Sequence, residues 1–429
     1  MTTEQSCPIT GAGDGAAPRG GTGQEPPLYP FENPTALEPP REWAELREGC
    51  PVAPVRMASG DTALLLTRYD DVRALLSDPR FTRELGAEDA AQVGTSEGGA
   101  FDRGRGREDE GTSTGSILSG PGHTRWRRLV GRSFTVKRVM ALQPRIAEIT
   151  HELIDAMVAG GVPADLKAGL GFPLPVYVIC ELLGVPREDH ARFAYWSDTL
   201  LNLTRYQQSE IDAAGREFFA YMVGHVQAKR AQPGDDLLSE LAAAVDAEDG
   251  TMSEAELIGT GQGLLIAGHE TTANMIGKMV SMLLSSGGRW EQLLADRTLV
   301  RGAVEESLRL DANPGFGMPR YVSERTEIGG TVLEAGTTVI SSMAAANRDG
   351  RAFAGPDEMD LTRSPNPHLA FGAGPHSCIG QSLARIELQT VLTALLDRLP
   401  TLELAVPAEE LRRREGLIVG GLEEVPVRW

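Results

Sequence analysis

The chain has 429 residues, of which 41% are hydrophobic, and a formal net charge of -19 at pH 7. This is an ordinary globular composition with enough apolar residues for a large core. The negative charge argues against a general binder of nucleic acids or of anionic membranes, because both need a positive field, and it leaves small neutral substrates open.

The N-terminal segment, residues 1–27, is rich in glycine, proline and small residues. We expect it to be disordered, because it cannot bury enough apolar surface to offset its ordering entropy. It lacks the basic start and apolar run of a secretory signal, and we find no run of about 18 apolar residues that could cross a bilayer, so we expect a cytoplasmic protein. Residues 28–429 show no linker and no repeat, which favours one mainly α-helical domain with a small β region.

Two stretches have the pattern of strands, residues 63–72 and residues 325–342. In the second stretch, Gly329 and Gly330 stand between alternating residues and predict a hairpin. Glycine, aspartate, glutamate and serine dominate residues 86–115, which is typical of a lid or a disordered segment.

A basic segment follows at residues 123–138, where His123 and Arg127 are one helical turn apart. The segment contains no acid, although the chain as a whole is strongly negative. Such a local reversal of sign is hard to ascribe to solubility. Its cations are Arg125, Arg127, Arg128, Arg132, Lys137 and Arg138.

A buried helix is predicted within residues 255–286, because this stretch is apolar nearly all round. Ala267, Gly268 and Thr271 share one face, where Gly268 leaves room for a ligand and the Thr271 hydroxyl can bond to the carbonyl of residue 267. Glu270 is costly in such a helix unless it is hydrated or transfers protons. The pattern alone fits equally well a threonine bonded to its own helix and a glutamate at the surface.

Residues 297–314 predict a helix that stops at Pro314. Glu306 falls in its apolar stripe and would be buried unpaired without Arg309, which lies one turn further on. A pair at this spacing adds only about 0.2–0.5 kcal/mol on an exposed helix and is weak evidence by itself.

The string FGAGPHSCIG, residues 371–380, places Cys378 at the mouth of a predicted helix. The other cysteines have no CxxC spacing, so neither a disulfide framework nor a structural zinc site is indicated. The glycines let backbone amides approach the sulfur, and the helix dipole favours a thiolate that could bind a metal. A buried cysteine in a glycine turn would be the alternative.

Phe371, Gly374, Cys378 and Gly380 fill the fixed places of Phe-x-x-Gly-x-x-x-Cys-x-Gly, so the chain resembles the haem-thiolate monooxygenases of the cytochrome P-450 superfamily, and in particular their soluble bacterial class. The resemblance covers nearly everything from residue 28 onward. It implies a helical triangular prism around one buried haem b (iron protoporphyrin IX), with Cys378 as the axial ligand of the iron.

The resemblance also implies which residues contact the haem. His123 and Arg127 would reach one propionate, and Arg320 and His376 would reach the other. The full set of implied cofactor contacts is His123, Arg127, Ala267, Gly268, Arg320, Phe371, Gly372, His376, Cys378 and Gly380.

Further roles follow from the same resemblance. Glu270 and Thr271 would be the catalytic pair that relays protons during oxygen activation. Glu306, Arg309 and Arg363 would form a structural lock beneath the haem, although the segment before Arg363 departs from the family pattern. The segment LSGPGHTR also replaces the family's usual Asp-Pro-Pro before the histidine.

The implied function is the use of O2 to hydroxylate or epoxidise an apolar, medium-sized organic substrate, in bacterial secondary-metabolite biosynthesis. Electrons would come from NAD(P)H through a ferredoxin reductase and a ferredoxin that docks on the basic segment. The enzyme would be a monomer that binds neither nucleic acid nor membrane.

Three alternatives stay open. The same haem enzyme could couple two carbons, or a carbon and an oxygen, oxidatively. A haem-thiolate sensor without turnover would not need Glu270 and Thr271. A cysteine hydrolase with Cys378 as nucleophile and His376 or His368 as base would be a colourless protein.

Overall fold

The computed structural model describes residues 25–83, 85, 87, 90–93, 120–202, 205–245, 252–286, 288–312, 314–414, 416 and 419–429. Of the segment expected to be disordered, residues 1–27, only residues 25–27 are described, and there the Arg56 N–H donates to Pro27 O at 2.9 Å. The expected lid or disorder over residues 86–115 lies mostly outside the described residues. The division into a terminal segment and a single domain stays a prediction.

Helices make up most of the described chain. The helices are α1 (Glu42–Gly49), α2 (Tyr69–Ser77), α3 (Gly120–Val130), α4 (Val136–Gly160), α5 (Pro173–Leu183), α6 (His190–Leu201), α7 (Gln208–Ala231), α8 (Leu237–Val245), α9 (Glu254–Leu284), α10 (Arg289–Ala295), α11 (Val300–Leu310), α12 (Met343–Ala346) and α13 (Gln381–Arg398). A short π-helix, η3 (Lys167–Gly171), and the 3-10 turns η4 (Arg187–Asp189), η5 (Arg297–Leu299), η6 (Gly374–His376) and η7 (Ala408–Glu410) connect them.

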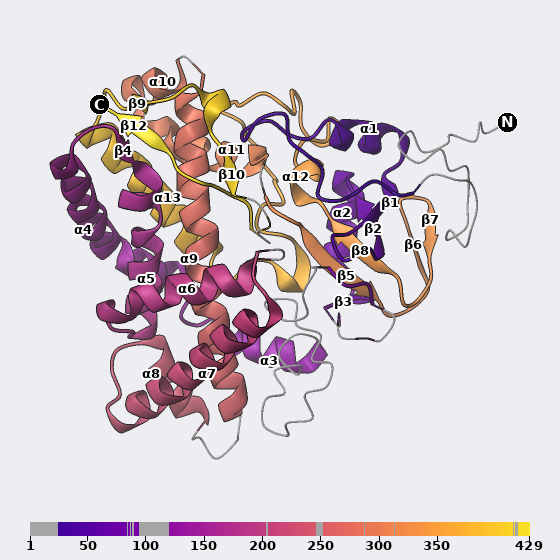
Figure 1. Cartoon of the computed structure of the whole chain (residues 1–429), viewed down its shortest axis with the longest axis horizontal. Coiled ribbons are helices and arrows are strands. Elements are labelled where there is room, and N and C mark those ends of the chain that lie inside the picture. The colour runs from indigo at the N-terminus through magenta and orange to yellow at the C-terminus, as the bar shows by residue number, and fades with distance from the viewer. Residues whose placement is uncertain are drawn as a thin grey trace.

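The strands are short. They are β1 (Val52–Arg56), β2 (Thr62–Leu66), β3 (Phe81–Thr82), β4 (Ala164–Asp165), β5 (Met318–Val322), β6 (Thr326–Ile328), β7 (Thr331–Leu333), β8 (Thr338–Ser341), β9 (Glu403–Leu404), β10 (Arg413–Arg414), β11 (Gly421–Leu422) and β12 (Pro426–Arg428). Figure 1 shows the sheet that contains β1, β2, β8, β5 and β3 on one side of the molecule, α4, α5 and α8 on the other, and the long helix α9 between them.

The largest sheet has the strand order β1-β2-β8-β5-β3, in which β2 and β8 are parallel and the other neighbours are antiparallel. At its edge, β3 pairs with β5 so that Phe81 faces Val322 and Thr82 faces Tyr321. This register brings the chain that leaves β3 beside the strand that carries Arg320.

The predicted hairpin is confirmed: β6 pairs with β7, and Ile328 stands opposite Thr331. Gly329 and Gly330 have φ angles of 57° and 77°, the left-handed values that a two-residue turn of this kind requires at both positions. The predicted strand over residues 63–72 is only partly correct, because β2 ends at Leu66 and α2 starts at Tyr69. The chain turns helical there because the apolar side chains at 69, 72, 75 and 76 follow a helical spacing and are all buried.

The predicted buried helix is confirmed as α9, which runs for 31 residues. A capping box fixes its start, because the Ser253 hydroxyl accepts a hydrogen bond from the Glu256 N–H at 3.2 Å and the Glu256 carboxylate accepts one from the Ser253 N–H at 2.7 Å. Within the described residues, no helix combines the length and the apolar character that crossing a membrane requires.

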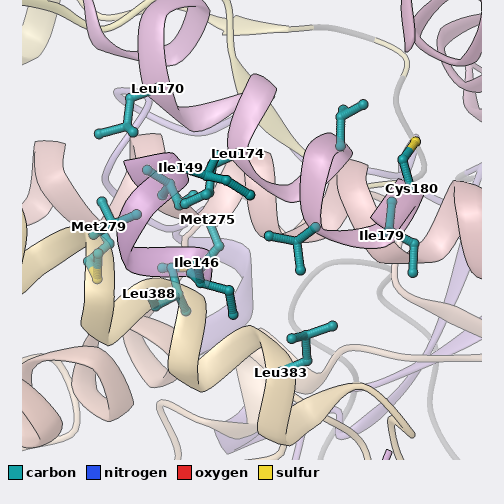
Figure 2. Close-up of a cluster of buried hydrophobic side chains, with 14 of the residues drawn as sticks. Ile146, Ile149, Leu170, Leu174, Ile179, Cys180, Met275, Met279, Leu383 and Leu388 are labelled. Carbon is teal, nitrogen blue, oxygen red and sulfur yellow. The ribbon is translucent and has the colours of Figure 1, made fainter. Parts of the chain in front are cut away.

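The core lies where α4, α5, α9 and α13 meet (Figure 2). Ile146 and Ile149 of α4, Met279 of α9 and Leu388 of α13 are at most 1% exposed. Truncating one such side chain to alanine typically costs about 2–5 kcal/mol. This packing fixes α9 relative to α13 and so sets the distance between α9 and the loop that precedes α13.

Candidate active site

Glu306, Arg309 and Arg363 come together in one hydrogen-bonded cluster. Arg309 donates from Nε to Glu306 Oε2 at 2.6 Å and from Nη2 to Oε1 at 2.9 Å, and Arg363 Nε donates to Oε1 at 2.9 Å. Burial alone would raise the pKa of Glu306, but these hydrogen bonds and that of the Asp360 N–H lower it. Asn366 donates to the remaining lone pairs at 3.1 Å, so the buried carboxylate is fully paired.

A second charged cluster lies beside the first one, and sequence reasoning missed it. Glu305 of α11 accepts two hydrogen bonds from Arg385 of α13, at 2.7 and 3.0 Å, and lies 2.9 Å from His368 Nε2. Burial alone would raise the pKa of Glu305, but the hydrogen bonds of His368 and Arg385 outweigh it and lower the pKa to about 2. The sequence features that could have indicated this cluster are the position of Glu305 next to Glu306 and that of Arg385 seven residues after Cys378.

The cysteine loop is held by its own backbone. The Cys378 N–H donates to Phe371 O at 2.7 Å, and Gly374 packs so closely on α2 that a Cβ there would lie 2.6 Å from Leu76 O. Cys378 is accessible to solvent although protein atoms surround its sulfur, and we call this partly enclosed region around Cys378, His376 and Arg127 the recess. Burial in this recess raises the pKa of its thiol, and the Gly380 N–H, Arg127 and Arg385 counteract the rise.

Helix α9 presents one open face to solvent, although it is buried along most of its length. Gly263, Ala267 and Thr271 are exposed there and are four residues apart, so they form one stripe of small side chains. Gly268 lies beside the stripe, and a Cβ at this position would come within 2.7 Å of Ile179 of α5. The structure therefore gives Gly268 a packing reason in addition to the ligand contact expected from the sequence.

Glu270 and Thr271 have different surroundings. The Thr271 hydroxyl donates to Ala267 O at 2.9 Å on the open face, as the sequence predicts. Glu270 is buried, and its Oε1 accepts a hydrogen bond from Asn274 Nδ2 at 3.0 Å. Its Oε2 lies 3.8 Å from Nε2 of His269, a buried ring whose Nδ1 faces Leu265 O at 2.7 Å. Glu270 and Thr271 are therefore adjacent in sequence but are not hydrogen-bonded to each other.

Positively charged and imidazole side chains gather at the edge of the recess. The rings of His123 and His376 lie 4.0 Å apart, and Arg127 donates to Ser377 Oγ at 3.1 Å. Arg320 is 3% exposed and donates to the carbonyl of the preceding residue, Pro319. A further member, Arg83, was not predicted from the sequence.

The positive charges of this cluster are not balanced by negative charges of the described residues. Burial, together with Arg83, His123, Arg320 and Arg127, lowers the pKa of His376 to about 3. Burial and Arg83 lower the pKa of Arg320 to about 9. Nδ1 of His376 and Nε of Arg83 are buried without a hydrogen-bond partner. In the described part of the chain, no carboxylate contributes to the pKa of His123, Arg83 or Arg320.

These residues fit a haem. The open stripe of small residues on α9 and the exposed Cys378 are surfaces that a flat ligand could cover, and two propionates would balance the cations beside Cys378. The described residues contain no cluster of three or more His, Cys, Asp or Glu that could hold a metal by themselves. A lone cysteine can serve as an axial ligand when a macrocycle supplies the other ligands.

Comparison with known proteins identifies the family of the chain. A family model for cytochrome P450 matches residues 289–411. The chain is 43% identical over 406 residues to nocardicin C N-oxygenase of Nocardia uniformis subsp. tsuyamanensis, which covers 94% of this chain and 98% of that protein. It is 42% identical over 411 residues to mycinamicin IV hydroxylase/epoxidase of Micromonospora griseorubida, covering 95% of this chain and all of the relative.

The fold agrees with the sequence relatives. The crystal structure of SgvP, proposed as a thioether synthase in the tailoring of griseoviridin, superposes with a TM-score of 0.87 at 39% identity, over 95% of this chain and 100% of that one. The chain therefore belongs to the cytochrome P450 family. It is an O2-dependent oxidoreductase, a monooxygenase of the bacterial type, and its family implies a haem cofactor and a small-molecule substrate.

Proposed function

We propose that the chain binds haem b and uses it to hydroxylate or epoxidise an apolar, medium-sized substrate in bacterial secondary-metabolite biosynthesis. The observation that carries this proposal is the exposed Cys378 beside a cluster of cations without a carboxylate partner among the described residues, together with the open stripe of small residues on α9. Relatives named as an N-oxygenase and as a hydroxylase/epoxidase support oxygen insertion.

Cys378 would hold the iron through its thiolate, with the Gly380 N–H donating to the sulfur. His123, Arg127, Arg320 and His376 would bind the two propionates, and Ala267, Gly268, Phe371 and Gly372 would contact the ring. When bound, the haem supplies the iron at which O2 is reduced by two electrons and two protons, so that one oxygen atom enters the substrate and the other leaves as water.

Thr271 and Glu270 would manage the protons. The Thr271 hydroxyl stands on the open face and donates its proton to Ala267 O, so its lone pairs can accept a hydrogen bond from a water molecule and hold it there. Glu270 can carry a proton, but it is buried against Asn274 and must turn or act through water to reach the recess. We therefore assign Thr271 the role of orienting the proton donor and Glu270 the role of resupplying it.

The open face favours an apolar substrate. Gly263 has no side chain and Ala267 contributes a methyl group, so the Thr271 hydroxyl is the single polar side chain of the stripe. The segment at residues 312–318 offers little further surface, because Ala312 and Phe316 are buried in the core.

The electron donor would be a ferredoxin that receives electrons from NAD(P)H through a reductase and docks on α3 and the start of α4. The basic surface is smaller than the sequence suggested, because Arg125 pairs with Glu256 at 2.8 Å and Arg138 pairs with Glu240 at 2.7 Å. Arg128, Arg132 and Lys137 are exposed, and the exposed apolar side chains of Val136 and Met140 lie next to them in sequence. Cations around an apolar centre suit an acidic protein partner.

This docking surface can be tested by charge reversal. Arg128→Glu with Arg132→Glu should slow reduction by ferredoxin and flatten its salt dependence, while reduction by dithionite and substrate affinity stay unchanged. Reversal of Arg325, which forms an exposed ion pair with Glu334, is the matched control. Reduction by ferredoxin at the wild-type rate in the double variant would place the docking surface elsewhere.

Oxidative coupling is the second candidate reaction. It is supported by the similarity to SgvP, whose proposed activity joins carbon and sulfur rather than inserting oxygen. The two outcomes differ in product mass, because oxygen insertion adds one oxygen atom whereas coupling removes two hydrogen atoms.

One experiment tests the whole proposal. The purified protein should be coloured, and its reduced carbon monoxide complex should show the long-wavelength Soret band of a thiolate-bound haem. Spectral titration with a panel of apolar natural products should then find a ligand, and turnover with ferredoxin and its reductase should give a product of defined mass. A colourless protein that does not take up haem would refute the proposal and favour the cysteine hydrolase.

The monomeric state and the cytoplasmic location of the protein stay predictions.

A further inference from the structure

The structure contains a cation that neither the sequence motifs nor the proposed haem contacts include. Arg83 directly follows β3 at the edge of the five-stranded sheet. In the antiparallel register of β3 and β5, residue 81 faces 322 and residue 82 faces 321. Continuing this register by one residue places Arg83 opposite Arg320, with both side chains on the same face of the sheet.

Two like charges in this position destabilise a sheet unless an anion lies between them. Arg320 is almost fully buried, and Nε of Arg83 is buried without any hydrogen-bond partner. Neither side chain forms an ion pair with a carboxylate in the described part of the chain. Among the described residues, nothing neutralises these two guanidinium groups, so a bound anion is the partner that their chemistry calls for.

Arg83 is also electrostatically coupled to the other cations of the recess. It contributes to lowering the pKa of His123, of His376 and of Arg320, and Arg127 contributes to lowering its own pKa. These groups come from the chain after β3, from α3, from β5 and from η6, four segments far apart in the sequence. All of them converge on the edge of the recess where the propionates are expected.

We propose that Arg83 is an additional haem-binding residue, which donates charge-assisted hydrogen bonds to the propionate that Arg320 also binds. This inference rests on the proposed function, because it requires a haem in the recess. Arg83, Arg127 and Arg320 then bring three fixed positive charges to two carboxylates. The orphaned Nε of Arg83 and its nearby Nη groups form a fork that suits one carboxylate.

The test measures how fast the holoenzyme loses haem to an excess of apomyoglobin. Arg83→Gln should release haem about tenfold faster than the wild type, the loss expected for one charge-assisted interaction. Arg83→Lys, which keeps the charge but not the fork, should lie between them. The midpoint potential of the haem should fall in Arg83→Gln, because a nearby positive charge that favours reduction is removed.

Arg80→Gln is the matched control, since Arg80 precedes β3, pairs with Asp78 at 2.6 Å on the surface and carries the same charge. It should lose haem at the wild-type rate. Haem loss from Arg83→Gln at the wild-type rate, or equally fast loss from Arg80→Gln, would overturn the assignment of Arg83. Unchanged haem retention with weaker binding of a carboxylate-bearing ligand would instead assign Arg83 to the substrate. If the wild-type chain took up no haem, the proposed function itself would fail.

Discussion

Arg309 and Arg320 are both buried, yet their surroundings are opposite. Arg309 is 0% exposed and directs its donors to Glu306 and to the backbone carbonyls of Asn347, Pro356 and Glu358. Arg320 is 3% exposed and faces Arg83, with a single hydrogen bond to its own strand. A buried charge is tolerated only when it is paired. The paired arginine therefore stabilises the fold, and the other is placed to bind an anion.

The largest expected effect concerns Cys378, the proposed iron ligand. Cys378→Ser should abolish the long-wavelength Soret band of the reduced carbon monoxide complex completely, because the thiolate is lost. Cys180→Ser is the control, since burial raises the pKa of the Cys180 thiol to about 12 and this residue packs in the core. Survival of the band in Cys378→Ser and its loss in Cys180→Ser would show that the ligand was assigned wrongly.

Substitution of the paired Arg309 should lower the stability of the fold. Arg309→Leu leaves Glu306 buried with fewer partners, and we expect it to lower the free energy of unfolding by about 3–5 kcal/mol, measured by urea titration. Arg325→Leu, which breaks an exposed ion pair with Glu334, should change it by no more than about 1 kcal/mol. Equal effects of the two substitutions would show that the buried lock has no special role.

The cluster of Glu305, His368 and Arg385 should make the stability of the fold depend on pH. Because the folded-state pKa of Glu305 is lowered to about 2, its stabilising effect is complete above its unfolded pKa and is lost as the pH falls towards 2. Glu305→Gln should cost about 2–3 kcal/mol at pH 7, and this difference should shrink as the pH is lowered from 5. Urea unfolding in steps from neutral to acidic pH measures it. A constant difference between the two proteins would contradict the assignment.

The smallest expected effect concerns the open face. Thr271→Ala should keep haem and substrate binding but reduce the product formed per nicotinamide consumed severalfold, with more peroxide, because the hydroxyl that orients the proton donor is gone. Thr272→Ala, the buried neighbour in α9, is the control and should leave this ratio unchanged. Unchanged coupling in Thr271→Ala would assign the orienting role to water or to the substrate.

The sequence predicted those parts of the site that one segment defines. Cys378 with its glycines, the Ala267 to Thr271 face and the spacing of Glu306 and Arg309 could all be found this way, because a helix or a tight loop places its residues by itself. The end of the strand at Leu66 was missed, because strand-like residues there give way to a helical spacing of the buried ones.

Contacts between distant segments could not be predicted. Arg83 approaches Arg320 only through the pairing of β3 with β5, and Glu305 meets Arg385 only through the packing of α11 on α13. The residues next to an arginine in the sequence do not show whether its charge is neutralised by a partner in the fold. Arg125 and Arg138 show the same limit, because their acidic partners lie on α9 and α8.

If haem binds as proposed, the unbalanced cluster would also make the abundance of this protein depend on haem supply. Without the cofactor, the cations of the four chain segments would repel one another, and binding of a ligand to the folded state alone adds stability by mass action. Chains made while haem is scarce should therefore open more often and be degraded sooner than chains made while it is plentiful. The same charges that select the cofactor would thus let the cell remove the copies that never receive one.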